Sequence, residues 1–116
     1  MTKVFVDTDV CLDLLSGRKP FNTIAEILFS KAERREIKIC VSAISFSNID
    51  YVLRSQYSSV HSRQLLGKFK TIVTIVPVDS KTIDLAIASD FNDFEDAIQH
   101  ACAIENKLTT LVTRNL

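Results

Sequence analysis

Short apolar runs that alternate with helical segments constrain the fold of this chain more than any other feature. Four such runs lie at residues 3–6, 37–41, 71–76 and 109–112. Strands of this kind are typical of a parallel sheet whose two faces are both covered by helices. Apolar spacing and capping signals predict helices over 8–16, 22–36, 43–55, 60–69, 80–87 and 93–106. The sequence therefore predicts the α/β class, as a three-layer α/β/α sandwich with a central parallel sheet.

Capping residues and chain breakers set the boundaries of these elements. Ser42 and Asp79 are expected to cap the helices that follow the second and third strands. Asn92 is the expected N-cap of the last helix. The run at 71–76 is β-branched throughout and predicts the strongest strand, which Pro77 ends.

Length and composition limit the class of protein. The 116 residues, 47% of them hydrophobic, suit one folded domain and not a disordered chain. Lys+Arg and Asp+Glu both number 14, and this balance excludes a strongly basic protein that wraps nucleic acid. No apolar run approaches the roughly 18 residues of a membrane helix. Asp7 lies where the apolar part of a signal peptide would be. We therefore expect no membrane contact and a cytoplasmic location. Cys11, Cys40 and Cys102 lie among apolar neighbours and are expected to be reduced core residues.

Acidic residues occur where a parallel sheet binds its ligands, beyond the carboxyl ends of the strands. Asp7 and Asp9 directly follow the first strand, and Asp93 and Asp96 begin the last helix. A spacing of three residues places the carboxylates of Asp93 and Asp96 on one helical face, from which they are expected to point toward the strand ends. The stripe of this helix that we expect to meet the sheet consists of Phe94, Ala97, Ile98 and Ala101.

Carboxylates that share a site repel one another and need a stabilising partner. At about 4 Å and an effective dielectric constant of about 20, a like-charged pair costs on the order of 4 kcal/mol. A shared proton, a Lys or Arg partner, or a divalent cation would offset this repulsion. An all-oxygen donor set selects Mg²⁺ or Mn²⁺, and such ions act on phosphate esters.

Plain structural roles compete with this interpretation. Helix dipoles and capping favour acidic residues in the first turn of a helix, which would explain Asp93 without a metal. Asp13 is expected to be a solvated helix position. His100 follows Asp96 by one turn, so it could touch the site, but a surface position is the simpler expectation.

Basic residues are concentrated in the middle of the chain. Residues 17–70 hold ten Lys or Arg and four acidic residues, whereas the segments on both sides are net acidic. An acidic metal centre beside a basic segment suits a phosphate backbone, because basic side chains position the strand. Solvated helix faces would give a similar distribution.

Four segments resemble, in order, the motifs of PIN domains, and the resemblance spans nearly the whole chain. VFVDTDVCLDLL resembles the first motif, in which an Asp ends the first strand, and VSAISFSNIDYVLR resembles the second, a helix after the second strand. DFEDAIQHACA resembles the third motif, whose Asp begins the penultimate helix, and LVTRN resembles the start of the fourth. The EDAIQHACA form is similar to the bacterial branch related to VapC-type toxins of toxin–antitoxin pairs.

The resemblance implies which residues form the site. Asp7 and Asp96 match the metal-binding aspartates of the family, and Asp93 matches an additional acid of this branch, so these three are the implied catalytic and metal-binding residues. The implied supporting residues are Thr8, Asp9, Asn48, Thr113 and Asn115.

The chain departs from the family pattern in two places. Asn48 stands where the second motif usually has Glu, and because an amide brings no negative charge, we expect weaker metal binding. The last acid of the family follows the TRN segment by a few residues, whereas this chain ends at Leu116. We therefore expect a single PIN-like domain over residues 1–116 that lacks the C-terminal end of the family.

The resemblance also implies a function. PIN proteins are typically Mg²⁺- or Mn²⁺-dependent nucleases of single-stranded RNA, and many toxins among them are held inactive by an antitoxin. The implied protein is therefore a metal-dependent ribonuclease toxin, with single-stranded RNA, an antitoxin protein and a second copy of itself as partners.

Two other functions remain open. Asp7-Thr8-Asp9-Val10 after a strand also resembles the start of haloacid-dehalogenase-type phosphatases, with Asp7 as nucleophile, Asp9 as acid and base, and Ser42 as a further phosphate contact. Asn48 and the expected loss of the C-terminal end favour, alternatively, a PIN-like module that binds RNA or protein without cleaving.

Overall fold

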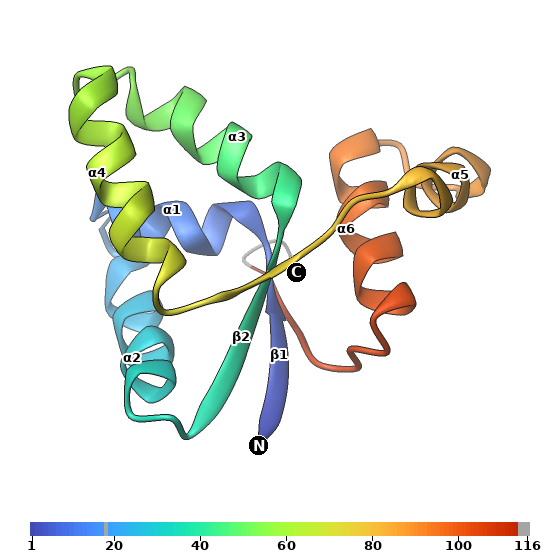
Figure 1. Cartoon of the computed structure of the whole chain (residues 1–116), viewed down its shortest axis with the longest axis horizontal. Coiled ribbons are helices and arrows are strands. Elements are labelled where there is room, and N and C mark those ends of the chain that lie inside the picture. Colours follow the sequence, from blue (N-terminus) through green and yellow to red (C-terminus); the bar gives the residue numbers. More distant parts are fainter. Residues whose placement is uncertain (18, 114–116) are drawn as a thin grey trace.

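The structure is a computed structural model that describes residues 1–17 and 19–113, and its centre is a sheet of four parallel strands in the order β3-β2-β1-β4 (Figure 1). The strands are β1 (Thr2–Val6), β2 (Ile37–Ser42), β3 (Thr74–Val76) and β4 (Leu111–Val112). The helices are α1 (Thr8–Ser16), α2 (Asn22–Glu33), α3 (Ala43–Leu53), α4 (Ser59–Lys70), α5 (Ser80–Ala88) and α6 (Phe94–Glu105). The predicted α/β fold with a central parallel sheet is confirmed.

Helices cover both faces of the sheet and form a separate core on each (Figure 1). On one face, Val4 and Val6 of β1 belong to the core that α1, α2, α3 and α4 complete. On the other face, Phe5 belongs to the core that α5 and α6 complete. Because successive side chains of a strand point to opposite faces, β1 needs apolar residues at every one of these positions. This explains why its sequence is an uninterrupted apolar run.

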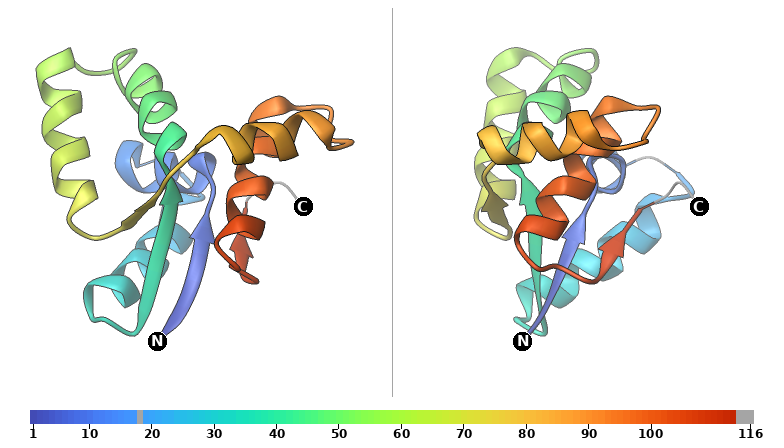
Figure 2. Two further views of the ribbon diagram at one scale, coloured as in Figure 1. Left: turned by 45° about the vertical axis from the view of Figure 1, so that its right-hand side comes forward. Right: turned by 90° about the vertical axis from the view of Figure 1, so that its right-hand side faces the viewer.

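The strand order reverses at β1. From β1 the chain continues to β2 and β3 on one side, and then crosses to β4 on the other side. In the β1–β4 pair, Phe5 lies opposite Leu111 and Val6 opposite Val112, and the right-hand view of Figure 2 shows the two strands side by side. Ligands of open α/β sheets bind beyond the strand ends at such a reversal. The carboxyl ends of β1 and β4 therefore mark the expected place of the site.

The prediction that 71–76 is the strongest strand is wrong. Only Thr74–Val76 is a strand, and it lies at the edge of the sheet with β2 as its partner. The amides of Thr71 and Ile72 instead donate to the carbonyls of Lys68 and Phe69, which continues the last turn of α4. Local helical hydrogen bonds thus prevail over the β-propensity of these residues.

Other boundaries also differ from the prediction, by up to three residues. α2 ends at Glu33 and not near residue 36, α3 ends at Leu53 and not near residue 55, and β4 covers Leu111–Val112 and not 109–112. Arg35, in the connection after α2, has a φ of 60°, which a continuing right-handed helix does not allow.

The three cysteines are free and buried, as predicted. Within the described ranges, no helix is long and apolar enough to cross a membrane.

Candidate functional site

Asp7 stands at the junction between β1 and α1. It is the N-cap of α1, with an extended backbone, and its Oδ1 accepts a hydrogen bond of 3.1 Å from the backbone N–H of Val10. Aspartate is among the preferred N-cap residues because its carboxylate satisfies an amide of the first turn. The sequence interpretation missed this structural role. A carboxylate has about four acceptor positions, so capping leaves Asp7 able to bind a further ligand.

Asp93 is the N-cap of α6, where Asn92 was predicted. Its Oδ1 accepts from the backbone N–H of Asp96 at 3.0 Å, and the helix begins at Phe94. We expected the spacing of three residues to align the carboxylates of Asp93 and Asp96. Instead, the Asp93 side chain is hydrogen-bonded to the Asp96 backbone. This is the plain capping role that competed with metal binding.

The expectation that Phe94 meets the sheet is wrong, since its side chain is 49% exposed. Burial in α6 begins one turn later, at Ala97 and Ile98. The first turn of α6 thus lies outside the core and carries the acidic residues.

Asp7 and Asp96 lie together, although 89 positions separate them in the sequence. Both line one pocket of about 220 Å³, whose wall consists of Asp7, Phe91, Asp96, Gln99, His100, Leu111 and Thr113. The pKa of Asp96 is raised, first by partial burial and then by the negative charges of Asp93, Asp7 and Asp9. Carboxylates from the end of β1 and the start of α6 therefore share one electrostatic environment at the reversal of strand order.

A second pocket shares Asp96 with the first. It has a volume of about 320 Å³ and is lined by Thr8, Asp9, Leu12, Asn48, Tyr51, Val52, Asp93, Glu95 and Asp96. The predicted supporting residues Thr8, Asp9 and Asn48 thus border this pocket, while Thr113 borders the first. Asn115 lies outside the described residues. Asp96 is the residue common to both pockets and stands at the centre of the candidate site.

The donor set suits a hard cation that retains part of its water shell. Among residues 1–17 and 19–113, no group of three or more Asp, Glu, His or Cys side chains is placed to hold a metal ion. Mg²⁺ is usually bound through one or two carboxylates and keeps several water ligands. The Asp7 and Asp96 pair offers the carboxylates that this mode of binding needs, and the pKa of Asp96 is raised by burial and by neighbouring carboxylates.

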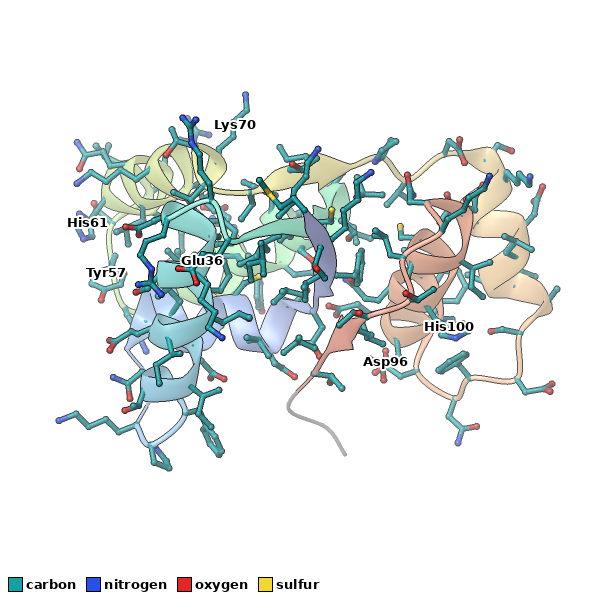
Figure 3. All side chains as sticks on the ribbon, turned by 90° about the horizontal axis from the view of Figure 1, so that it is seen from below. Glu36, Tyr57, His61, Lys70, Asp96 and His100 are labelled. Carbon is teal, nitrogen blue, oxygen red and sulfur yellow. The ribbon has the colours of Figure 1, made fainter. Side chains whose placement is uncertain are left out.

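His100 is exposed, as predicted, and also lines the first pocket. Its ring lies against Phe91, with 5.0 Å between the ring centroids. Figure 3 shows Asp96 and His100 at one side of the molecule, with His61, Tyr57 and Lys70 far from them. Lys70, the basic residue at the end of α4, therefore does not border the acidic site.

A buried polar network joins the elements that carry the acidic residues, and no sequence pattern indicated it as a unit. The hydroxyls of Thr8 and Ser45 are 2.8 Å apart, and Gln99 Nε2 donates to Ser45 Oγ at 3.0 Å and to Thr8 Oγ1 at 3.4 Å. These side chains come from α1, α3 and α6 and are all buried. The network joins the residue after Asp7 to the helix that carries Asp96, and so fixes the two elements relative to each other.

The expectation that Asp13 is solvated is also wrong. Its side chain is 2% exposed, because α1 is packed against both α2 and α3. Burial also raises the pKa of the neighbouring Cys11 thiol well above its usual range, and the negative charges of Asp7 and Asp13 add to this effect.

Comparisons with known proteins agree with this architecture. The VapC20 toxin of Mycobacterium tuberculosis, described as cleaving the sarcin–ricin loop, is 15% identical with a TM-score of 0.73, and the alignment covers 97% of this chain and 91% of that one. VapBC2 of Rickettsia felis, bound to a DNA fragment from its promoter, is 17% identical with a TM-score of 0.69, and the alignment covers 98% of this chain and 88% of that one. A toxin–antitoxin complex from Klebsiella pneumoniae is 20% identical with a TM-score of 0.69, covering 97% and 86%.

These identities are low and establish a shared fold alone. No curated protein matches the sequence significantly. The family assignment comes from the sequence itself, because residues 3–116 match the model of the PIN domain. That match spans nearly the whole chain and confirms the resemblance of the four motifs: the chain belongs to the PIN domain family.

Proposed function

We propose that this protein is a divalent-metal-dependent ribonuclease that hydrolyses phosphodiester bonds of single-stranded RNA, and that it is the toxin of a toxin–antitoxin pair. The observation that carries the proposal is the convergence of Asp7 and Asp96 in one pocket at the reversal of strand order, in a chain of the PIN family. The toxins and toxin–antitoxin complexes among its structural neighbours support the biological context.

Asp7 and Asp96 would hold Mg²⁺ or Mn²⁺, with Asp93 adding negative charge close by. When bound, such an ion lowers the pKa of a water ligand and neutralises charge that develops on the phosphate. The protein orients the metal-binding side chains. The hydrogen bond from the Val10 amide holds the Asp7 carboxylate, and the network of Thr8, Ser45 and Gln99 holds α6 against α1. Asn48 would offer a neutral oxygen from the second pocket, consistent with weaker metal binding than a Glu would give.

Cleavage of labelled single-stranded RNA in the presence of Mn²⁺ tests this proposal. We expect cleavage that a chelator abolishes. Asp7→Asn should lower the rate by about 100-fold or more, because it removes a charge that holds the cation. Asparagine caps helices as well as aspartate does, so the fold should persist.

Asp79→Asn is the matched control. Asp79 caps α5 through a 3.1 Å hydrogen bond from the Thr82 amide, the same bond length as that between Val10 and Asp7, but it lines neither pocket of the candidate site. This variant should cleave as the wild type does. Cleavage that survives both the chelator and Asp7→Asn would contradict the proposal, and RNA binding without cleavage would favour a non-catalytic module.

Family membership removes the haloacid-dehalogenase-type phosphatase as a candidate. Burial of Ser42, the expected further phosphate contact of that mechanism, argues against it independently, because its side chain is fully enclosed.

Exposed apolar residues support the proposed protein partners. Phe21, Ile24 and Ile27, at the start of α2 and along it, are all exposed. A surface of this kind fits a second copy of the chain or an antitoxin. Light scattering at micromolar concentration should give the mass of a dimer, and a monomer would contradict the proposed homodimer.

A further inference from the structure

One side of the first pocket is not explained by a metal site. Asp7 and Asp96 account for its acidic wall, but Phe91, His100 and Leu111 give it an aromatic and apolar wall that a hydrated cation does not need. Gln99 is a further residue of this lining. The pocket thus combines rings, a neutral hydrogen-bonding group and carboxylates, which is more than metal binding requires.

The aromatic wall is solvent-facing. The Phe91 side chain is 46% exposed, and its ring packs against that of His100 at an interplanar angle of 45°. Phe91 comes from the connection before α6 and His100 from α6 itself. Nucleobases stack on exposed aromatic rings with little sequence preference, because every base has a π-face.

Gln99 supplies the second, independent observation. Its side chain is only 5% exposed, Nε2 is used by Ser45 and Thr8, and Oε1 has no hydrogen-bond partner among the described residues. Turning the carboxamide over would satisfy the oxygen and leave the nitrogen unpartnered, since both hydroxyls can donate or accept. In either orientation one end of a buried amide on the pocket wall lacks a partner. Buried polar groups are normally hydrogen-bonded. Because Gln99 Oε1 has almost no exposed surface, a ligand reaches it only when the carboxamide turns toward the pocket.

We propose that this pocket is a nucleoside subsite, in which the base stacks on Phe91 and His100 and the Gln99 carboxamide hydrogen-bonds to the same nucleoside. The inference rests on the proposed function and deepens it. The nucleoside would be the one adjoining the phosphate placed at Asp7 and Asp96, because these carboxylates share the pocket with the rings.

Adenosine is the probe, because it is uncharged, has no bond to cleave and needs no metal. The chain contains two histidines, and His61 also lies against an aromatic ring, that of Tyr57, at the opposite side of the molecule (Figure 3). The imidazole resonances in an NMR titration of the metal-free protein therefore carry an internal control. We expect saturable shifts of His100 and none of His61.

Two variants separate stacking from general effects. Phe91→Ala should raise the dissociation constant of adenosine on the order of tenfold, the loss expected for one stacked base. Phe94→Ala is the matched control, since Phe94 is 49% exposed in the same region and lines neither pocket of the site. Phe91→Tyr should restore binding, and free ribose should shift neither histidine.

Three results would overturn the subsite: no saturable shift of His100, equal shifts of both histidines, or equal weakening by Phe91→Ala and Phe94→Ala. Because adenosine binding is measured without metal or cleavage, the subsite can fail while nuclease activity stands. Likewise, binding of adenosine by a protein that does not cleave RNA would leave the subsite in place and remove the nuclease proposal.

Discussion

Ser45→Ala tests the buried network beneath the site. Ser45 Oγ lies 2.8 Å from Thr8 Oγ1 and accepts from Gln99 Nε2 at 3.0 Å, so the substitution deletes two short hydrogen bonds. Gln99 would keep only the longer contact of 3.4 Å to Thr8. A hydrogen bond contributes about 1 kcal/mol, and a buried group left unsatisfied costs about 1–3 kcal/mol. We therefore expect Ser45→Ala to lower the free energy of unfolding by about 2–3 kcal/mol.

Ser47→Ala provides the reference for this measurement. Ser47 lies two positions further along α3 and is exposed. Both substitutions raise helix propensity equally, by about 0.5 kcal/mol, so their difference isolates the network. Urea unfolding, monitored by circular dichroism, measures the free energy of unfolding of both variants. The dependence of this free energy on urea concentration should be the same in both.

Equal midpoints for the two variants would refute this reasoning. It would mean that the hydroxyl of Ser45 is replaced without loss, and that Thr8 and Gln99 do not depend on it. A loss of about 2 kcal/mol with retained fold should also reduce RNA cleavage, because α1 and α6 carry the two central aspartates.

Three further predictions concern titratable groups. Because the pKa of Asp96 is raised in the folded protein, the ionised carboxylate destabilises the metal-free protein at pH values above the ordinary Asp pKa. Asp96→Asn should therefore raise the melting temperature of the metal-free protein near pH 7. The same variant should abolish the further rise in melting temperature that Mg²⁺ gives the wild type. Asp79 is the opposite case, since hydrogen bonds from the amide and hydroxyl of Thr82 lower its pKa. The stabilisation by its carboxylate should be present above the ordinary Asp pKa and should be lost as the pH falls through the pKa of the folded protein. In a pH series of urea unfolding curves, Asp79→Ala should therefore destabilise the protein at pH 7 and have no effect at the acid end. Burial raises the pKa of Cys102 to about 11. Mass spectrometry should therefore find this thiol unmodified by iodoacetamide at pH 8 until denaturant is added. Rapid labelling of the native protein would contradict the burial of Cys102.

The parts of the fold that the sequence predicted correctly depend on regular periodicity. β1 is apolar at consecutive positions because Phe5 faces one core while Val4 and Val6 face the other. That requirement is local, so it is visible as a run of letters. The position of Asp7 at the end of this strand follows directly, and with it the edge of the sheet where the site lies.

The errors arise where tertiary context decides. Phe94 has the right spacing for the core face of α6, but the first turn of that helix lies outside the core, which no periodicity reveals. Asp13 has the polarity of a surface residue, yet α1 is enclosed by its neighbours. The same holds for β3, where helical hydrogen bonds of Thr71 and Ile72 prevail over a β-branched sequence.

The buried network could not be predicted from local pattern. Gln99 is separated from Ser45 by 54 positions and from Thr8 by 91, and none of the three is apolar. Hydrophobic periodicity therefore assigns them to no face. Only the folded arrangement shows that they meet, and that Gln99 reaches the pocket shared by Asp7 and Asp96.

The most direct test of the central claim is the position of a bound cation. Crystals of the wild-type protein soaked in Mn²⁺ should give an anomalous-scattering peak within coordination distance of carboxylate oxygens of both Asp7 and Asp96, and crystals of Asp7→Asn should lose it. A peak elsewhere on the molecule, or a peak bound by neither aspartate, would contradict the claim that these two side chains form the metal centre.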